Sequence, residues 1–179
     1  HIGVRPESSR RACRAGIELA GFIPHIFPRA TRVIVVDHVH TSCSVRIPCF
    51  VVGAGTVDDD AKRTHEAVWQ ATEAGLAAAR PGATTDDVWR AQSNVLEAAG
   101  SIGNNVGRMG HGLGLQLTEP PSNRPGDGTV LKPGMILTIE PGMEYAPGKM
   151  IVHEENVVIT GDGNDILTKR APRELPVIT

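Results

Sequence analysis

The sequence of 179 residues contains no long apolar run, and none of its runs approaches the ~20 residues of a membrane-spanning helix. It also lacks a basic start followed by an apolar stretch, which is typical of a secretory signal. The formal net charge of −2 gives no reason to expect nucleic acid or an anionic membrane as a partner. We therefore expect a cytoplasmic protein that binds neither nucleic acid nor a membrane.

Cysteine is scarce, and several common signatures of catalysis are absent. The three cysteines, Cys13, Cys43 and Cys49, form no CxxC pair, which argues against a disulfide framework and favours a reducing compartment. Neither an HExxH metal motif nor a GxSxG nucleophile elbow occurs. The stretch "GAGTVDDD" at 53–60 lacks the lysine of a phosphate-binding loop and is interpreted as a strand-to-helix turn.

The first 50 residues differ in composition from the rest of the chain. They hold seven arginines, no lysine, all three cysteines and only three acidic residues, whereas 51–179 hold 17 acidic residues. We predict an atypical N-terminal segment at 1–50 and a catalytic domain at 51–179. The segment is divergent, poorly ordered or read in a shifted frame, and His1 in place of methionine suggests a fragment.

Hydrophobic patterning predicts two helices between sets of strands. The β-branched stretches at 32–40 and 49–55 predict strands. Acidic residues from Asp58 to Asp60 favour a helix start, and Ala61, His65, Val68, Thr72 and Gly75 form its predicted buried face. A second helix follows Thr84 or Thr85, with Val88, Ala91, Val95 and Ala98 as its predicted apolar face.

After Gly100, glycine and proline separate short strands at 134–142, 149–160 and 164–168. Two helices packed on a turn-rich antiparallel sheet make an α+β domain.

Three residues from separate segments could carry chemistry. His111 lies in "GHG", Glu140 ends an apolar strand, and Glu154 interrupts one. Imidazole and carboxylate together suit Zn, Fe or Mn, and a carboxylate can bridge two ions. Each residue also has an interpretation without chemistry: His111 as a turn residue, Glu140 before a turn, and Glu154-Glu155 on the solvent face of a strand. Residue types alone leave both interpretations open, although an acid in a buried strand is costly unless it is paired.

Four blocks of the chain resemble the pita-bread family of creatinase, prolidase, aminopeptidase P and methionine aminopeptidase. They are the helix end "AAARPG" and the blocks "GRMGHGLGLQLTEPPS", "LKPGMILTIEPGMEYAPGK" and "IVHEENVVITGDGNDILTKRAPREL". The resemblance spans about residues 50–179, in family order. It implies the pita-bread fold, a curved antiparallel sheet with flanking helices, here incomplete at the N-terminus.

The resemblance also implies a metal site. Its metal-dependent members hold two divalent ions (Mn, Co, Zn or Fe) with two Asp, one His and two Glu. By motif position, His111, Glu140 and Glu154 match the His and Glu ligands, with Glu154 bridging both ions. Glu140 is also the catalytic residue that receives a proton from the attacking water.

Two departures from the family pattern bear on activity. The Asp ligands belong at about 35–46, where Asp37 is the only candidate, and no acidic residue lies between it and Asp58. Proline-cleaving relatives carry a histidine where this chain has Thr118, and a hydroxyl cannot shuttle protons near neutral pH as imidazole does.

These observations predict a metal-dependent hydrolase of the Xaa-Pro peptidase/creatinase class that cleaves an amide bond in a short peptide or modified amino acid. One alternative is a carbon–sulfur lyase acting on dimethylsulfoniopropionate, or an ectoine-type hydrolase, on the same fold. Another is a catalytically inactive binding scaffold. The resemblance to prolidases further implies a homodimer of the full-length protein.

Overall fold

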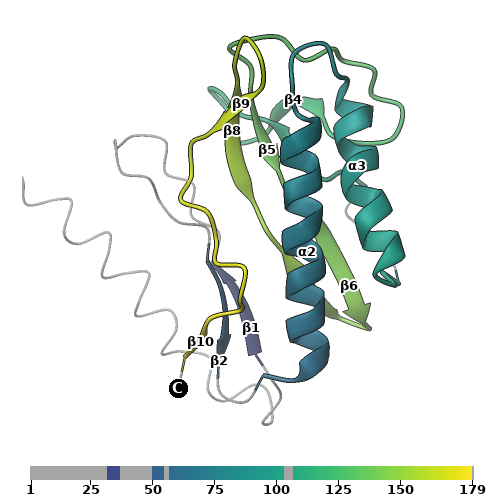
Figure 1. Ribbon diagram of the computed structural model, residues 1–179, viewed down its shortest axis with the longest axis vertical. Coiled ribbons are helices and arrows are strands. Elements are labelled where there is room, and N and C mark those ends of the chain that lie inside the picture. The colour runs from purple at the N-terminus through teal and green to yellow at the C-terminus, as the bar shows by residue number, and fades with distance from the viewer. Residues whose placement is uncertain (1–31, 37–49, 55–56, 103–106, 179) are drawn as a thin grey trace, which may run out of the picture. The chain divides into compact units, whose positions relative to one another are not determined.

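The computed structural model describes residues 32–36, 50–54, 57–102 and 107–178 (Figure 1). All of them belong to one compact unit, Thr31–Thr179. The predicted N-terminal segment lies outside these residues except for two short strands, β1 (Arg32–Val36) and β2 (Phe50–Ala54). Both strands were predicted, and they pair antiparallel to each other.

Helix α2 (Asp59–Ala78) confirms the predicted start and buried face. The Asp58 carboxylate accepts a hydrogen bond of 2.7 Å from the N–H of Ala61, so one unpaired donor of the first turn is satisfied. Asp59 and Asp60 add negative charge at the positive end of the helix. All five residues predicted for the core face are buried, including the polar His65 and Thr72.

Helix α3 (Thr85–Ala98) begins as predicted but buries a different face. Thr84 is the cap and forms a reciprocal capping box with Asp87. The buried stripe follows Val88, Gln92 and Leu96 at four-residue spacing, whereas Ala98 is exposed. Of the predicted apolar face only Val88 is fully buried, since Ala91 and Val95 are half-buried. Gln92 is buried because its amide donates to the carbonyls of Val88 and Met109.

The strands form three sheets. The largest has the order β4-β3-β5-β8-β9, and every pairing in it is antiparallel. A two-stranded sheet joins β6 and β7, and the third has the order β1-β2-β10, in which β10 runs parallel to β2. The remaining strands are β3 (His111–Gly112), β4 (Glu119–Ser122), β5 (Ile136–Ile139), β6 (Gly142–Ala146), β7 (Lys149–Val152), β8 (Glu155–Ile159), β9 (Asn164–Ile166) and β10 (Val177–Ile178).

Two predicted continuous strands are each broken in two, and these predictions were wrong in that respect. The stretch 134–142 stops at Ile139 and resumes at Gly142, and 149–160 stops at Val152 and resumes at Glu155. The breaks lie opposite each other, because β5 pairs with β8 on one side of them and β6 with β7 on the other. Glu140 and Glu154 lie in these breaks.

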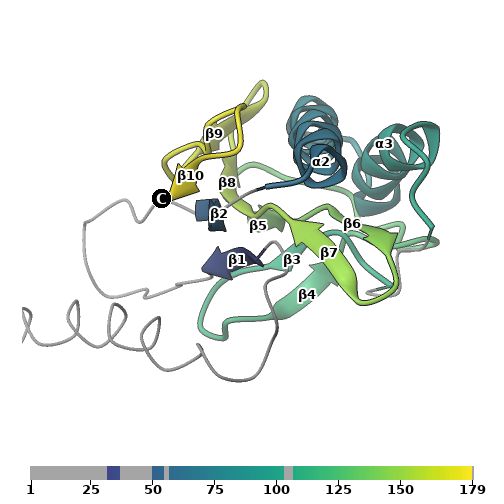
Figure 2. The same cartoon turned by 90° about the horizontal axis from the view of Figure 1, so that it is seen from below.

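Both helices pack on one face of the sheet, as Figure 2 shows. Leu137 and Ile139 of β5 and Val157 and Ile159 of β8 point toward the helices and form one core cluster with Leu76 of α2. Because side chains alternate along a strand, the residues between them point to the opposite face. The helix-free face therefore carries Thr138 and Asn156, which are register partners. These layers confirm the predicted α+β class.

Neither helix of the described residues combines the length and the hydropathy that crossing a membrane requires.

A methyl group at Gly75 is expected to destabilise the fold. A Cβ there would lie 2.6 Å from Ile139 Cγ2 and 2.9 Å from Gln92 Cδ, closer than van der Waals contact allows. Gly75→Ala should therefore lower the free energy of unfolding by about 1–3 kcal/mol, as overpacked cores do. Helix propensity alone predicts the opposite, a gain of about 1 kcal/mol. The sign of the change in urea denaturation decides between the two effects.

The carboxylate of Asp127 is expected to make the fold sensitive to acid. It accepts the Thr129 hydroxyl at 2.7 Å and the N–H groups of Thr129 and Ser122 at 3.1 Å each. The Thr129 hydroxyl and these N–H groups lower the pKa of Asp127 to about 2.

A depressed folded-state pKa contributes stability that is complete above the unfolded pKa near 3.8 and is lost as pH falls through 2. The free energy of unfolding of the wild type should exceed that of Asp127→Asn by about 1–2 kcal/mol at pH 6. This difference between the two proteins should become smaller between pH 4 and 2. Denaturation of both proteins across this range measures the gap. A gap that stays constant would contradict the prediction.

Candidate metal centre

The glycines beside His111 allow two backbone segments to approach it closely. Gly110 has φ of +134°, and a Cβ there would overlap the carbonyl oxygen of Thr138 and the side-chain amide of Asn123. At Gly112 a Cβ would lie 2.7 Å from the carbonyl carbon of Pro120. The "GHG" block is therefore wedged between β4 and β5, where only glycine fits.

The His111 ring is buried and oriented by its own strand. Its side chain is 7% exposed, and its Nδ1 lies 2.9 Å from the Gly112 carbonyl oxygen. Since a carbonyl oxygen only accepts, Nδ1 carries a proton, which leaves Nε2 as the nitrogen that a neutral ring offers to a metal ion. Nε2 lies 3.8 Å from Glu140 Oε2. A histidine whose second nitrogen donates to a carbonyl is the usual arrangement of a metal ligand.

Glu140 and Glu154 lie opposite each other across the break between the sheets. The ladder pairs Ile139 with Glu155 on one side of them and Gly142 with Val152 on the other. Within the break, the N–H of His153 donates to the carbonyl of Pro141 at 3.2 Å, so the two backbones stay adjacent. Glu154 is half-buried between the fully buried His153 and Glu155, and Glu140 meets His111 with 3.8 Å between Oε2 and Nε2.

The residues present fit part of a metal site. Two ligands about 2.1 Å from one ion lie about 3–4 Å apart, which matches the 3.8 Å between His111 and Glu140. Among the residues that the structure describes, however, no three His, Cys, Asp or Glu side chains come together closely enough to hold an ion. Glu154 thus does not join the other two in one cluster. The three-ligand set remains a prediction, and Asp37 lies outside the described residues.

The loop after His111 is exposed and apolar. Leu115 and Leu117 are 104% and 59% exposed, and Thr118, which stands where relatives carry histidine, is also on the surface. The Glu119 carboxylate folds back beneath the loop and accepts the N–H of Gln116 at 3.3 Å. The loop is therefore pinned at its base and presents leucine side chains to solvent.

Sequence reasoning missed a set of buried polar residues behind the predicted ligands. His153 and Glu155, on either side of Glu154, are both at most 1% exposed. His153 contacts His65 of α2, and Glu155 contacts Arg170 near the C-terminus. Their partners are distant in sequence, so no local pattern signals them. The one available signal is the pair of polar residues within an otherwise apolar strand.

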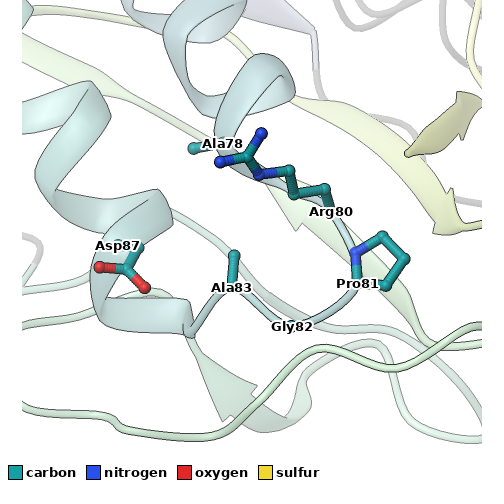
Figure 3. Close-up of a pocket in the computed structure, with 6 residues that line it drawn as sticks. All are labelled: Ala78, Arg80, Pro81, Gly82, Ala83 and Asp87. Carbon is teal, nitrogen blue, oxygen red and sulfur yellow. The ribbon is translucent and has the colours of Figure 1, made fainter. Parts of the chain in front are cut away.

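One pocket of about 600 Å³ lies at the connection between α2 and α3 (Figure 3). It contains none of the predicted ligands. The N–H groups of the first turn of α3 are already bonded to Thr129, Asp127 and Thr84, so they offer no anion site. Its lining consists of Ala78, Arg80, Pro81, Gly82, Ala83 and Asp87.

Comparison with known proteins identifies the family. The sequence profile described as metallopeptidase family M24 matches residues 33–161, well over half of the chain. The chain belongs to this family. The match confirms the resemblance to the pita-bread enzymes. It begins at residue 33, before the domain boundary predicted at residue 51.

Relatives and solved structures agree with this assignment. The probable dipeptidase PepE of Mycobacterium tuberculosis is 36% identical over 124 residues, which cover 69% of this chain and 33% of that protein. The Xaa-Pro dipeptidase of Lactobacillus helveticus is 34% identical, over 71% of this chain and 34% of its own length. The crystal structure of dipeptidase PepE from Mycobacterium ulcerans superposes with a TM-score of 0.66 at 35% identity, covering 72% of this chain and 34% of that one.

The fold comparison extends to a more distant enzyme. Methionine aminopeptidase from Rickettsia prowazekii superposes with a TM-score of 0.56 at 24% identity, covering 66% of this chain and 57% of that one, which shows the shared fold alone. Together these structures confirm the pita-bread fold. The chain spans about a third of the length of the curated relatives it matches.

Proposed function

We propose that this chain carries the metal-binding part of a hydrolase that cleaves the amide bond of a dipeptide or a similar small substrate. The observation that supports it best is the 3.8 Å approach of His111 Nε2 to Glu140 Oε2 within a chain of family M24. The relatives named as dipeptidases support the substrate class.

The residues of the site have separate roles in this proposal. Two bound divalent ions (Mn, Co, Zn or Fe) would acidify the attacking water and polarise the scissile carbonyl. His111 is held in the tautomer that ligates through Nε2, and Glu140 and Glu154 supply carboxylate oxygens. The Glu140 side chain is 27% exposed, so it can reach water, accept its proton and pass that proton to the leaving amine.

Substrate assays with added metal test the proposal. The chain should bind Mn²⁺ and hydrolyse dipeptides, with Xaa-Pro and proline-free peptides compared in parallel. Dimethylsulfoniopropionate belongs in the same panel, because its cleavage without peptide hydrolysis would favour the carbon–sulfur lyase. Metal binding with no turnover of any amide substrate would contradict the hydrolase.

Thr118 is expected to limit the cleavage of proline peptides. It is exposed in the loop after His111, where a histidine could shuttle protons near neutral pH. Thr118→His should raise kcat/KM for Xaa-Pro dipeptides by at least about tenfold, a part of the hundredfold or more that general acid–base catalysis usually contributes. Thr118→Asn adds a polar side chain without a titratable group and should leave the value unchanged. Equal gains from both variants would show that proton transfer is not the cause.

The sequence also favours a second candidate, a catalytically inactive scaffold that binds peptides. Its support is the absence of any acidic residue between Asp37 and Asp58, where two Asp ligands belong by resemblance. The two candidates differ in metal content after dialysis, which elemental analysis measures. The scaffold predicts peptide binding with no bound metal.

A further inference from the structure

Buried polar side chains bracket Glu154 on the helix side of its strand. From Ile151 to Glu155 burial alternates, with positions 151, 153 and 155 buried toward α2 and Glu154 turned to the other face. An apolar residue at 153 or 155 would need no partner there. The chain instead places a histidine and a carboxylate at these positions, and both have specific partners.

The first of two supporting contacts, here called brackets, is the hydrogen bond between His153 and His65. His65 Nε2 lies 3.2 Å from the carbonyl oxygen of Pro172, which only accepts, so this nitrogen carries the proton. His65 Nδ1 is then an acceptor, and His153 Nε2, 3.1 Å away, must donate to it. The Pro172 carbonyl therefore fixes the direction of the hydrogen bond between the two rings.

The bond pattern leaves His153 Nδ1 buried and without a hydrogen-bond partner among the described residues. An apolar pair at these positions would leave no buried polar atom unsatisfied. Stability alone therefore does not account for the histidine pair. A role in geometry does, since hydrogen bonds fix direction where apolar contacts do not.

The second bracket holds Glu155. Its carboxylate, fully buried, accepts Arg170 Nη1 at 3.2 Å, the N–H of Ala171 at 3.3 Å and the hydroxyl of Thr168. Arg170 in turn pairs with Glu73 of α2 and lies 5.1 Å over the ring of Trp69. Helix α2 and the segment 168–172 thus bind both neighbours of Glu154.

We propose that His65, His153, Glu155 and Arg170 are positioning residues that hold Glu154 on the metal-binding face. The inference rests on the proposed function, because Glu154 is taken as a metal ligand there. The two brackets restrain the backbone on either side of Glu154. The position from which its side chain extends is therefore fixed. Loosening a bracket should weaken metal binding without removing any ligand.

Calorimetric titration with Mn²⁺ tests this on the whole chain. His153→Leu removes the donor to His65 and should weaken Mn²⁺ binding about tenfold, the lower end of losses seen when the supports of metal ligands are removed. His153→Gln keeps a donor near the position of Nε2 and should restore affinity to within about threefold of wild type. Thr168→Val removes a bond to Glu155 at nearly constant volume and should also weaken binding, which covers the case in which His153→Leu fails to fold.

Val68→Ala is the matched control. Val68 is fully buried in the same helix, and its apolar side chain forms no hydrogen bond with either bracket, so its truncation should lower the thermal midpoint while leaving Mn²⁺ affinity unchanged. Wild-type Mn²⁺ affinity in both His153→Leu and Thr168→Val would overturn this inference but not the proposed function. A loss of Mn²⁺ affinity in Val68→Ala as large as theirs would do the same. A wild-type chain that binds no Mn²⁺ would overturn the proposed function as well.

Discussion

Replacement of His111 by alanine is expected to remove bound metal and to lower hydrolytic activity by at least about a thousandfold. The ring is buried, its Nδ1–H is committed to the Gly112 carbonyl, and its Nε2 lies 3.8 Å from Glu140 Oε2. Removing it eliminates an imidazole ligand for which alanine offers no substitute.

The measurement is metal content by elemental analysis, together with dipeptide turnover at saturating Mn²⁺. Met109→Ala serves as the control, because Met109 is as deeply buried two residues upstream but packs in the core on the helix side. That variant should lose about 2–5 kcal/mol of stability while retaining metal. Metal content in His111→Ala equal to wild type would refute the assignment of His111 as a ligand.

The two helices show which parts of the fold local sequence could predict. All five residues predicted for the buried face of α2 are buried, because they recur at helical spacing, although the face also includes Thr64, Ala67, Ala71 and Leu76. In α3 the same method failed at Gln92, a polar residue whose burial depends on the carbonyl of Met109, 17 positions away. A method that looks only for apolar residues does not include a buried amide of this kind. The predicted buried face of α3 was therefore displaced around the helix axis from the observed one.

The strands show a similar limit. Apolar runs identified both long segments, but the breaks at Glu140 and Glu154 arise from a change of pairing partner between two sheets. Periodicity within one strand contains no information about such a change. The breaks nonetheless fall at the two residues that the family resemblance singled out.

The candidate site divides along the same line. His111, Glu140 and Glu154 came from motif resemblance, and the structure brings His111 and Glu140 within 3.8 Å of each other, while the role of Glu154 stays a prediction. The supporting residues could not be predicted, because His65 and His153 are 88 positions apart and meet only through the tertiary fold. Glu155 was weighed only as a solvent-facing acid, yet it is fully buried with Arg170.

The second large effect is expected at Gly110, where alanine should disrupt the site through the backbone. The residue has φ of +134°, a region that side chains rarely adopt, and a Cβ would overlap the Thr138 carbonyl and the Asn123 amide. Neither obstacle is the flexible end of a side chain, because the carbonyl belongs to the central strand β5 and the Asn123 amide donates to it at 3.0 Å. Gly110→Ala should lower the free energy of unfolding by about 3 kcal/mol or more, adding overpacking to backbone strain.

The consequence for function follows from what Gly110 joins. Its carbonyl accepts the N–H of Asn123 at 3.0 Å, and the adjacent Met109 carbonyl accepts the N–H of Glu140 at 3.0 Å. Displacing this strand therefore moves His111 and Glu140 relative to each other, and Mn²⁺ affinity should fall together with stability.

Gly126→Ala separates the effect of backbone strain from that of steric overlap, because Gly126 also has a positive φ, +77°, but no atom lies within 4 Å of its Cβ position. That variant should lose about 1 kcal/mol and bind Mn²⁺ as wild type does. Equal losses in the two variants would mean that backbone conformation, and not the close approach of β3 to β5, is what requires glycine beside the histidine.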